Sequence, residues 1–108
     1  MRHFKSGAIR DDDNNKIDYE GFLSPLVIER FGQYMHKHRI QADGKLRDSD
    51  NWQKGFGKDV VMKSMWRHFF SVWKAHRQGV DNQEELCALL FNVMAYLHEE
   101  LQKDTPVE

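Results

Sequence analysis

The segment that most constrains the fold is "DNQEELCALLFNVMAYLHEELQK" (81–103), which is apolar on almost every side of a helix. Aliphatic residues three or four positions apart predict one core stripe, formed by Leu86, Leu89, Leu90, Val93, Leu97 and Leu101. A second apolar face holds Cys87, Phe91, Met94 and His98. Asp81 or Asn82 is expected to cap the helix, with Glu84 and Glu85 in its first turn. Such a helix in a chain of 108 residues predicts burial at a subunit interface.

An earlier segment, "SPLVIERFGQYMHKHRI" (24–40), carries a strong helix-start signal. Ser24 is the expected N-cap, and Pro25 occupies the first helical position. The spacing predicts one apolar-to-amphipathic stripe, formed by Val27, Phe31, Tyr34 and His38. Gly32 inside this helix is unfavourable by about 1 kcal/mol relative to alanine, which indicates close approach of another backbone or of a ligand.

A third helix is predicted over "DVVMKSMWRHFFSVWKAHRQG", with Asp59 as N-cap and Gly79 as the stop. Its expected stripe is Met62, Met65, Phe69, Val72 and His76, widened by Val61, Trp66 and Trp73. Since the helix is apolar over more than half its circumference, we expect it to pack on two sides.

No strand pattern is convincing, so the sequence predicts one all-α domain over residues 1–108. The expected fold is a small bundle of three main helices with a long ordered loop, completed by oligomerisation. Residues 1–23 are expected to be irregular, and residues 102–108 to form a frayed tail.

Composition narrows the class of function. The formal net charge of −1 does not argue for direct nucleic-acid binding or membrane adhesion, and no apolar run approaches the roughly 20 residues that span a bilayer. The N-terminus lacks the apolar core of a signal peptide. Cys87 is the single cysteine, so no internal disulfide is possible and a cytoplasmic setting is expected.

The segment "QADGKLRDSDNWQKGFGK" (41–58) contains three glycines and predicts a loop of about 18 residues. Leu46, Trp52 and Phe56 are suitable anchors, so an ordered loop is expected. Its polar residues suit a nucleotide site, because carboxylates hold Mg²⁺, cations meet phosphates and an aromatic ring packs on a base. The residues that supply these groups are Asp48, Asp50, Asn51, Trp52 and Lys54.

The helices add further candidates, each with a plainer alternative. Arg67 is either a solvated arginine or a phosphate contact, and the adjacent His68 is expected at the edge of the core. Asn92, in the middle of an apolar helix, either ties down a neighbouring loop or faces a polar pocket shared with Glu85. His36 and His38 could bind zinc, but residues two apart on a helix point to different faces.

Most named motifs are absent from the sequence. There is no P-loop, GxGxxG, GxSxG or HExxH, and "DGKLRDSDNW" fails as a calcium loop because Trp52 stands where an oxygen ligand belongs.

Five stretches occur in a fixed order: "GAIRD", "YEGFLSPLVIERFGQYM", "DSDNWQKG", "SMWRHFF" and "ALLFNVMAYL". Together they resemble the phage dATP/dGTP diphosphohydrolase N-terminal domain family, over about residues 3–101. The resemblance implies an all-α, MazG-like nucleotide pyrophosphohydrolase that uses Mg²⁺ or Mn²⁺. Such enzymes convert a deoxynucleoside triphosphate to the monophosphate and pyrophosphate, and work as dimers or tetramers with sites between subunits.

The family motifs map onto particular residues of this chain. Arg10 and Asp11 match the N-terminal "RD", and the remaining matches are Asn51, Trp52, Lys54, Arg67, His68 and Asn92. Glu85 occupies a place where relatives carry a histidine. The resulting assignment puts Asp50 and Glu85 in catalysis and Asp48, Asp50 and Glu85 around a metal.

One departure leaves two hypotheses open. MazG-type enzymes hold metal with ExxE and ExxD helical motifs, and neither occurs here. Either loop acids together with Glu85 hold the metal, or the chain is a non-catalytic phage accessory protein that binds a nucleotide or a host protein. A purely structural helical protein would explain the apolar last helix but not "DNWQKG".

Overall fold

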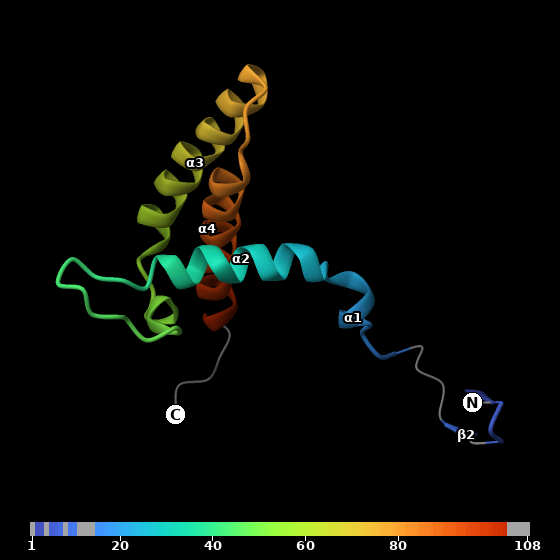
Figure 1. The fold of residues 1–108 in the computed structure, drawn as a ribbon. Coiled ribbons are helices and arrows are strands. Elements are labelled where there is room, and N and C mark those ends of the chain that lie inside the picture. Colours follow the sequence, from blue (N-terminus) through green and yellow to red (C-terminus); the bar gives the residue numbers. More distant parts are fainter. Residues whose placement is uncertain (1, 4, 8, 11–14, 104–108) are drawn as a thin grey trace.

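The computed structural model describes residues 2–3, 5–7, 9–10 and 15–103. The elements are β1 (Arg2–His3), β2 (Ile9–Arg10), α1 (Tyr19–Phe22), α2 (Pro25–Lys37), the 3-10 helix η1 (Asn51–Lys54), α3 (Lys58–Gln78) and α4 (Gln83–Gln102). In Figure 1, α3 and α4 form a helical hairpin, and α2 runs across it and packs on α4. The expected all-α architecture with three main helices is confirmed.

The helix ends follow the local sequence. The Ser24 hydroxyl accepts a hydrogen bond from the Val27 N–H at 3.3 Å, and Pro25 opens α2 as expected. Gly79 ends α3 in the left-handed region at φ 68°, as expected. The expected cap of α3 is wrong by two residues, because the helix begins at Lys58 after Gly57 and Asp59 lies in its first turn.

The core between α3 and α4 is made of small side chains. Val61 and Ala75 of α3 are buried, as are Cys87, Ala88, Asn92 and Ala95 of α4. Alanine at these positions lets the two helix backbones approach closely. The leucine stripe expected to form the core of α4 is wrong for the single chain, since Leu86, Leu97 and Leu101 are 45%, 55% and 62% exposed.

The stripe of α3 also differs from the expected one. Its inner face follows Val61, Met65, His68, Val72 and Ala75, which are buried or half-buried. Met62 and Phe69, which were expected in the core, are 38% and 54% exposed. The periodicity was compatible with either face, because α3 is apolar around more than half its circumference.

Ion pairs join α2 to the start of α4. The Arg30 guanidinium lies 3.0 Å from Glu84 and also donates to the Gln83 side chain at 3.2 Å. Lys37 forms a second ion pair with Glu84. These contacts fix the crossing of α2 over the hairpin.

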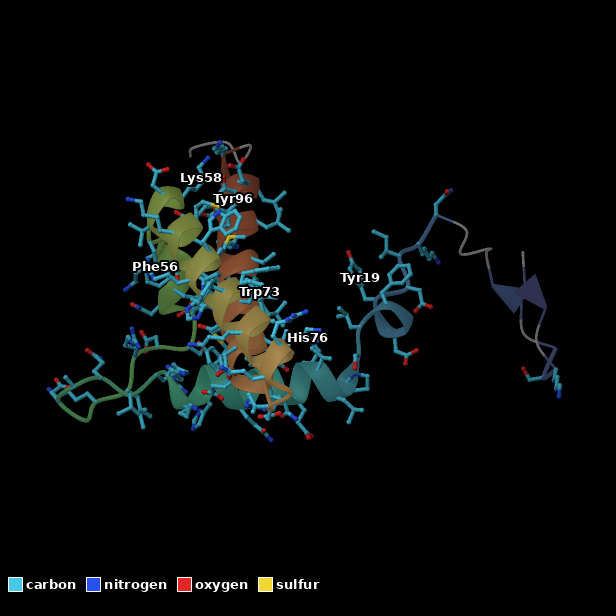
Figure 2. The ribbon with its side chains drawn as sticks, turned by 90° about the horizontal axis from the view of Figure 1, so that it is seen from above. Tyr19, Phe56, Lys58, Trp73, His76 and Tyr96 are labelled. Atoms are coloured by element: carbon cyan, nitrogen blue, oxygen red, sulfur yellow. The ribbon has the colours of Figure 1, made fainter. Side chains whose placement is uncertain are left out.

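The N-terminal region is more regular than expected. β1 and β2 pair antiparallel with Arg2 opposite Arg10, and Asp18 caps α1 by accepting from the Gly21 N–H at 3.0 Å. Neither the strand pair nor α1 packs against another described element. Figure 2 shows Tyr19 on α1 well apart from the bundle. The frayed tail expected at 102–108 lies outside the described residues from 104 onward.

The molecule is extended. Its radius of gyration is 19.1 Å, whereas a compact domain of about 100 residues has roughly 13 Å. No large side chain in the described part is fully buried. Within that part, no helix combines the length and apolarity needed to cross a membrane.

Candidate functional site

A cavity of about 430 Å³ lies where the end of α2, the following loop and α4 meet. We call it the α2–loop cavity. Its wall consists of Gly32, Tyr34, Met35, His36, His38, Arg39, Arg47, Asp48, Ser49, Asn51, Trp52, Phe56 and Phe91. This volume falls within the range of small-molecule sites, and the lining combines aromatic rings with a few charged groups.

Two arginines of the wall belong to a short backbone ribbon that follows α2. The Arg47 N–H donates to the Arg39 carbonyl at 2.8 Å, and Ile40 and Leu46 form a bridge beyond them. The ribbon turns at Gly44, whose φ of 82° is the left-handed conformation that favours glycine. Arg39 and Arg47 therefore stand opposite each other at the open end of this ribbon.

The side chains of these arginines are held in place by backbone carbonyls. Arg39 Nε donates to the Arg47 carbonyl at 2.8 Å. Arg47 Nη2 donates to the His38 carbonyl at the end of α2. Each guanidinium has five N–H donors, so both keep donors for an anion in the cavity. A fixed guanidinium loses less entropy when it binds phosphate oxygens.

Trp52 of η1 forms the aromatic floor and anchors the loop. Its ring meets Phe91 edge-on at 5.9 Å and His98 at 5.0 Å between centroids. Phe56 adds a second edge contact with Phe91 at 6.1 Å. The expected anchoring of the loop by Trp52 and Phe56 is confirmed by these contacts.

The C-terminal end of the loop lies against α4, where its glycines contact Glu99. Glu99 Oε1 accepts from the Gly57 N–H at 3.2 Å. Gly55 has a φ of 95°, and a Cβ built there would lie 3.0 Å from the same oxygen. A side chain at position 55 would therefore meet both backbone strain and a carboxylate.

Both histidines of the "HKH" stretch line the cavity, and the expectation that they point to different faces stays a prediction. α2 ends at Lys37, and His38 is the C-cap residue rather than a helical one. His38 also lies 3.7 Å from Glu84, beyond the cavity wall.

Charge and burial set the electrostatics around the cavity. Burial raises the pKa of the Tyr34 hydroxyl above its usual value of 10.0, and the nearby Glu84 carboxylate adds to the rise. The Tyr34 ring packs 4.3 Å from the His38 ring. The Tyr34 hydroxyl is therefore a neutral hydrogen-bonding group at physiological pH.

The structure separates the site residues predicted from the sequence into two groups. Asp48, Asn51 and Trp52 line the α2–loop cavity. Asp50 and Lys54 lie on the same loop, exposed, at the N-cap and last position of η1. They are not part of the cavity wall.

The remaining predicted residues lie outside the cavity wall, and all of them except Arg10 are on the helical hairpin. Arg67 is exposed on α3, and His68 is half-buried on its inner face. Glu85 is half-buried in the first turn of α4. Asn92 is buried, and its Nδ2 donates to the Ala88 carbonyl of its own helix at 2.8 Å rather than to a loop. Arg10 lies in β2, and its side chain is outside the described residues.

The described residues contain no group of three or more His, Cys, Asp or Glu side chains that could hold a metal ion. Asp48, Asp50 and Glu85 are all described, so they do not form a three-ligand site within one chain. Asp48 is the one of the three that lines the cavity.

Sequence reasoning missed the residues that give the cavity its charge and much of its apolar wall. These are Arg39, Arg47, Tyr34, Phe56 and Phe91 as site residues. A signal for the two arginines was present in "RIQADGKLR", where Asp-Gly stands between apolar residues and predicts a hairpin turn. The observed pairing is centred on Asp43, and Arg39 and Arg47 are each four residues from it, so they become neighbours across the ribbon.

No protein-family model, curated protein or solved structure matches this chain. The candidate site therefore stands on its own geometry: two fixed guanidinium groups and a set of aromatic rings around one cavity.

Proposed function

We propose that this chain binds a (deoxy)nucleoside triphosphate in the α2–loop cavity and cuts it to the monophosphate and pyrophosphate. The observation that supports binding is the joint presence of Arg39, Arg47 and the Trp52 ring in the wall of one cavity. Cleavage is what the sequence resemblance implies. The proposal assigns the activity to the cytoplasm of a phage-infected host cell.

The cavity offers distinct partners to the two ends of a nucleotide. Guanidinium groups bind phosphate oxygens with fixed, bidentate geometry, which favours Arg39 and Arg47 as the phosphate contacts. Aromatic faces pack on bases, and the Asn51 side chain can exchange hydrogen bonds with a base edge.

Mg²⁺ or Mn²⁺ enters this proposal as the ion carried by the nucleotide. Mg²⁺ is commonly bound by one or two carboxylates together with substrate phosphates. The single carboxylate in the cavity wall, Asp48, suits that role.

Binding can be tested by titration calorimetry with non-hydrolysable dATP and dGTP analogues in the presence of Mg²⁺. Each charged hydrogen bond contributes about 1.5–3 kcal/mol, so the double variant Arg39→Gln/Arg47→Gln, which removes both arginines of the cavity wall, should weaken binding by about a hundredfold or more. The control is Lys45→Gln, an exposed cation at the ribbon turn that does not line the cavity. Equal loss in both variants would show that general charge, not the cavity, attracts the nucleotide.

Cleavage needs a separate assay, in which each dNTP is incubated with the protein and Mg²⁺ or Mn²⁺ and the products are separated by chromatography. Monophosphate and pyrophosphate from wild-type protein support the enzyme. Asp48→Asn and Glu85→Gln are matched tests of the two acids, of which the cavity geometry favours Asp48.

The second candidate is a non-catalytic phage accessory protein that sequesters a nucleotide in the same cavity. The observation in its favour is that Asp48, Asp50 and Glu85 do not come together in one chain. Binding in the calorimeter without product on the chromatogram would support sequestration. No binding of any nucleotide would overturn both candidates and leave a protein partner as the ligand.

A further inference from the structure

The end of α2 places two histidines beside the arginines of the α2–loop cavity. The His38 N–H donates to the Tyr34 carbonyl at 3.3 Å, and the Arg39 N–H donates to the His36 carbonyl at 3.2 Å. His36, His38 and Arg39 all line the cavity. Arg47 lines it from the facing side of the ribbon and donates to the His38 carbonyl. Four side chains that can carry positive charge therefore surround one cavity.

The imidazole rings of these histidines are not used to hold the fold together. The His36 side chain is exposed and forms no hydrogen bond or ion pair with a described residue. His38 Nε2 lies 3.7 Å from Glu84 Oε1, which is too far for a hydrogen bond. Both rings therefore keep nitrogen atoms that a ligand in the cavity can bind.

Positive groups outnumber negative ones in the described wall. Arg39 and Arg47 are permanent cations, and Asp48 is the one carboxylate. The pKa of Tyr34 is raised above 10.0 by burial and by Glu84, so its hydroxyl stays neutral where histidines titrate. The other wall residues have no group that titrates: Gly32, Met35, Ser49, Asn51, Trp52, Phe56 and Phe91.

Beyond the wall, Glu84 of α4 is a charged group that faces His38. Its carboxylate is paired with Lys37 and Arg30, and their hydrogen bonds lower its pKa to about 2. Glu84 therefore keeps its negative charge throughout the pH range in which histidines titrate. A protonated His38 would gain this carboxylate as an opposite charge at 3.7 Å.

The combination of arginines and histidines suits a chain of phosphate groups. Histidine is the side chain that gains positive charge as the pH falls from about 8 to 5. Imidazolium and guanidinium groups both donate charge-assisted hydrogen bonds to phosphate oxygens, and these are roughly twice as strong as neutral ones. The cavity volume of about 430 Å³ leaves room for more than one phosphate group.

We propose that His36 and His38 bind the phosphate chain of the ligand together with Arg39 and Arg47, so that the histidines strengthen binding as the pH falls. The inference rests on the proposed function for the class of ligand, and it adds two binding residues and a pH dependence. Neither histidine is among the residues to which the family motifs map.

The test is titration calorimetry of the full chain with inorganic tripolyphosphate at about pH 6 and about pH 8.5. The variant His36→Gln/His38→Gln keeps hydrogen-bonding side chains but cannot become charged. Wild-type protein should bind about tenfold more tightly than this variant at pH 6, and within about twofold of it at pH 8.5. The ratio at each pH removes the titration of tripolyphosphate itself, because both proteins meet the same ligand.

His76→Gln is the matched control, since His76 is an exposed histidine of α3 outside the cavity wall. It should follow wild-type protein at both pH values. A ratio that does not change with pH, or an equal loss in His76→Gln, would overturn the inference. If circular dichroism shows that the double variant is unfolded, the single variants His36→Gln and His38→Gln replace it, each with about a threefold loss at pH 6.

This inference and the proposed function fail in different ways. Tripolyphosphate that does not bind, or binds without the histidine effect, would remove His36 and His38 from the site, whereas binding of the dNTP analogues would still support the proposed function. Histidine-dependent binding of tripolyphosphate without binding of any nucleotide analogue would support the phosphate-chain site and overturn the proposed function.

Discussion

Gly32 weakens the helix that carries it without a steric reason within the chain. It lies inside α2 and lines the α2–loop cavity, and a Cβ built there would meet nothing within 4 Å. The close backbone approach suggested by the sequence is therefore wrong within one chain, while the alternative of a ligand stays a prediction. Glycine at this position costs helix stability without relieving any clash.

Gly32→Ala should raise the free energy of unfolding by about 1 kcal/mol, because alanine favours a helix interior and the space is open. The melting temperature should rise by roughly 4–8 °C for a domain of this size. Gly57→Ala is the control, since its Cβ would also meet nothing but its φ is 87°. That variant should melt lower than wild type, and a fall for both variants would contradict the open space at position 32.

At the scale of elements, Glu84 is the link between α2 and α4. Its hydrogen bond from Lys37, followed by the one from Arg30, lowers its pKa from 4.5 to about 2. A carboxyl group whose pKa is lower in the folded state stabilises the fold above its ordinary pKa. That contribution is lost as the pH falls from about 4.5 through 2.

Thermal melts between pH 6 and pH 2 test this link. The melting temperature of wild-type protein should fall more steeply between pH 4.5 and pH 2 than that of Glu84→Gln, which has no carboxylate to lose. Glu29→Gln, at an exposed acid of α2, should follow the wild-type curve. Parallel curves for wild type and Glu84→Gln would mean that the ion pairs add nothing to the docking of α2.

The α3–α4 hairpin depends on small residues where its helices touch. Ala95 is 3% exposed in the core, so Ala95→Leu would force the helices apart and should cost about 1–3 kcal/mol. The exposed Ala42 on the ribbon offers the matched change, and Ala42→Leu should leave the melting temperature nearly unchanged. Equal melting of both variants, measured by circular dichroism, would show that the hairpin core has room to spare.

The sequence predicted the helices well and their packing poorly, for reasons visible in individual residues. Ser24, Pro25 and Gly79 are local signals, and local signals decide where helices begin and end. The buried face of each helix was assigned by the size of its apolar side chains, and this favoured Leu86 and Leu97 over Ala88 and Ala95. Close helix approach selects small residues, so the size of apolar side chains pointed to the wrong face.

The candidate site was predicted only in part, because some of its residues are set by local sequence and others by tertiary geometry. Trp52 and Asn51 stood out as unusual loop residues and do line the cavity. Arg39 and Arg47 meet only because the chain turns back at Gly44, which is a matter of tertiary geometry. Residues chosen by family resemblance, such as Arg67 and Glu85, lie on the hairpin, away from that cavity.

At the scale of the whole molecule, two hollows of the surface differ in the side chains that line them. The α2–loop cavity has charged and aromatic side chains in its wall, whereas the depression on the α3–α4 hairpin lined by Met62, Met65, Trp66, Phe69 and Leu89 is apolar throughout. The two hollows share no lining residue. A substitution in one lining should therefore leave the side chains of the other in place.

Trp52 has one side in the cavity wall and its edge on Phe91 and His98 of α4. The loop that carries Trp52 therefore forms part of the cavity wall and also packs over the end of α4. A ligand that binds only when the loop is in this position will stabilise the packed loop by mass action. Ligand binding in the cavity should then slow amide hydrogen exchange along the last turns of α4.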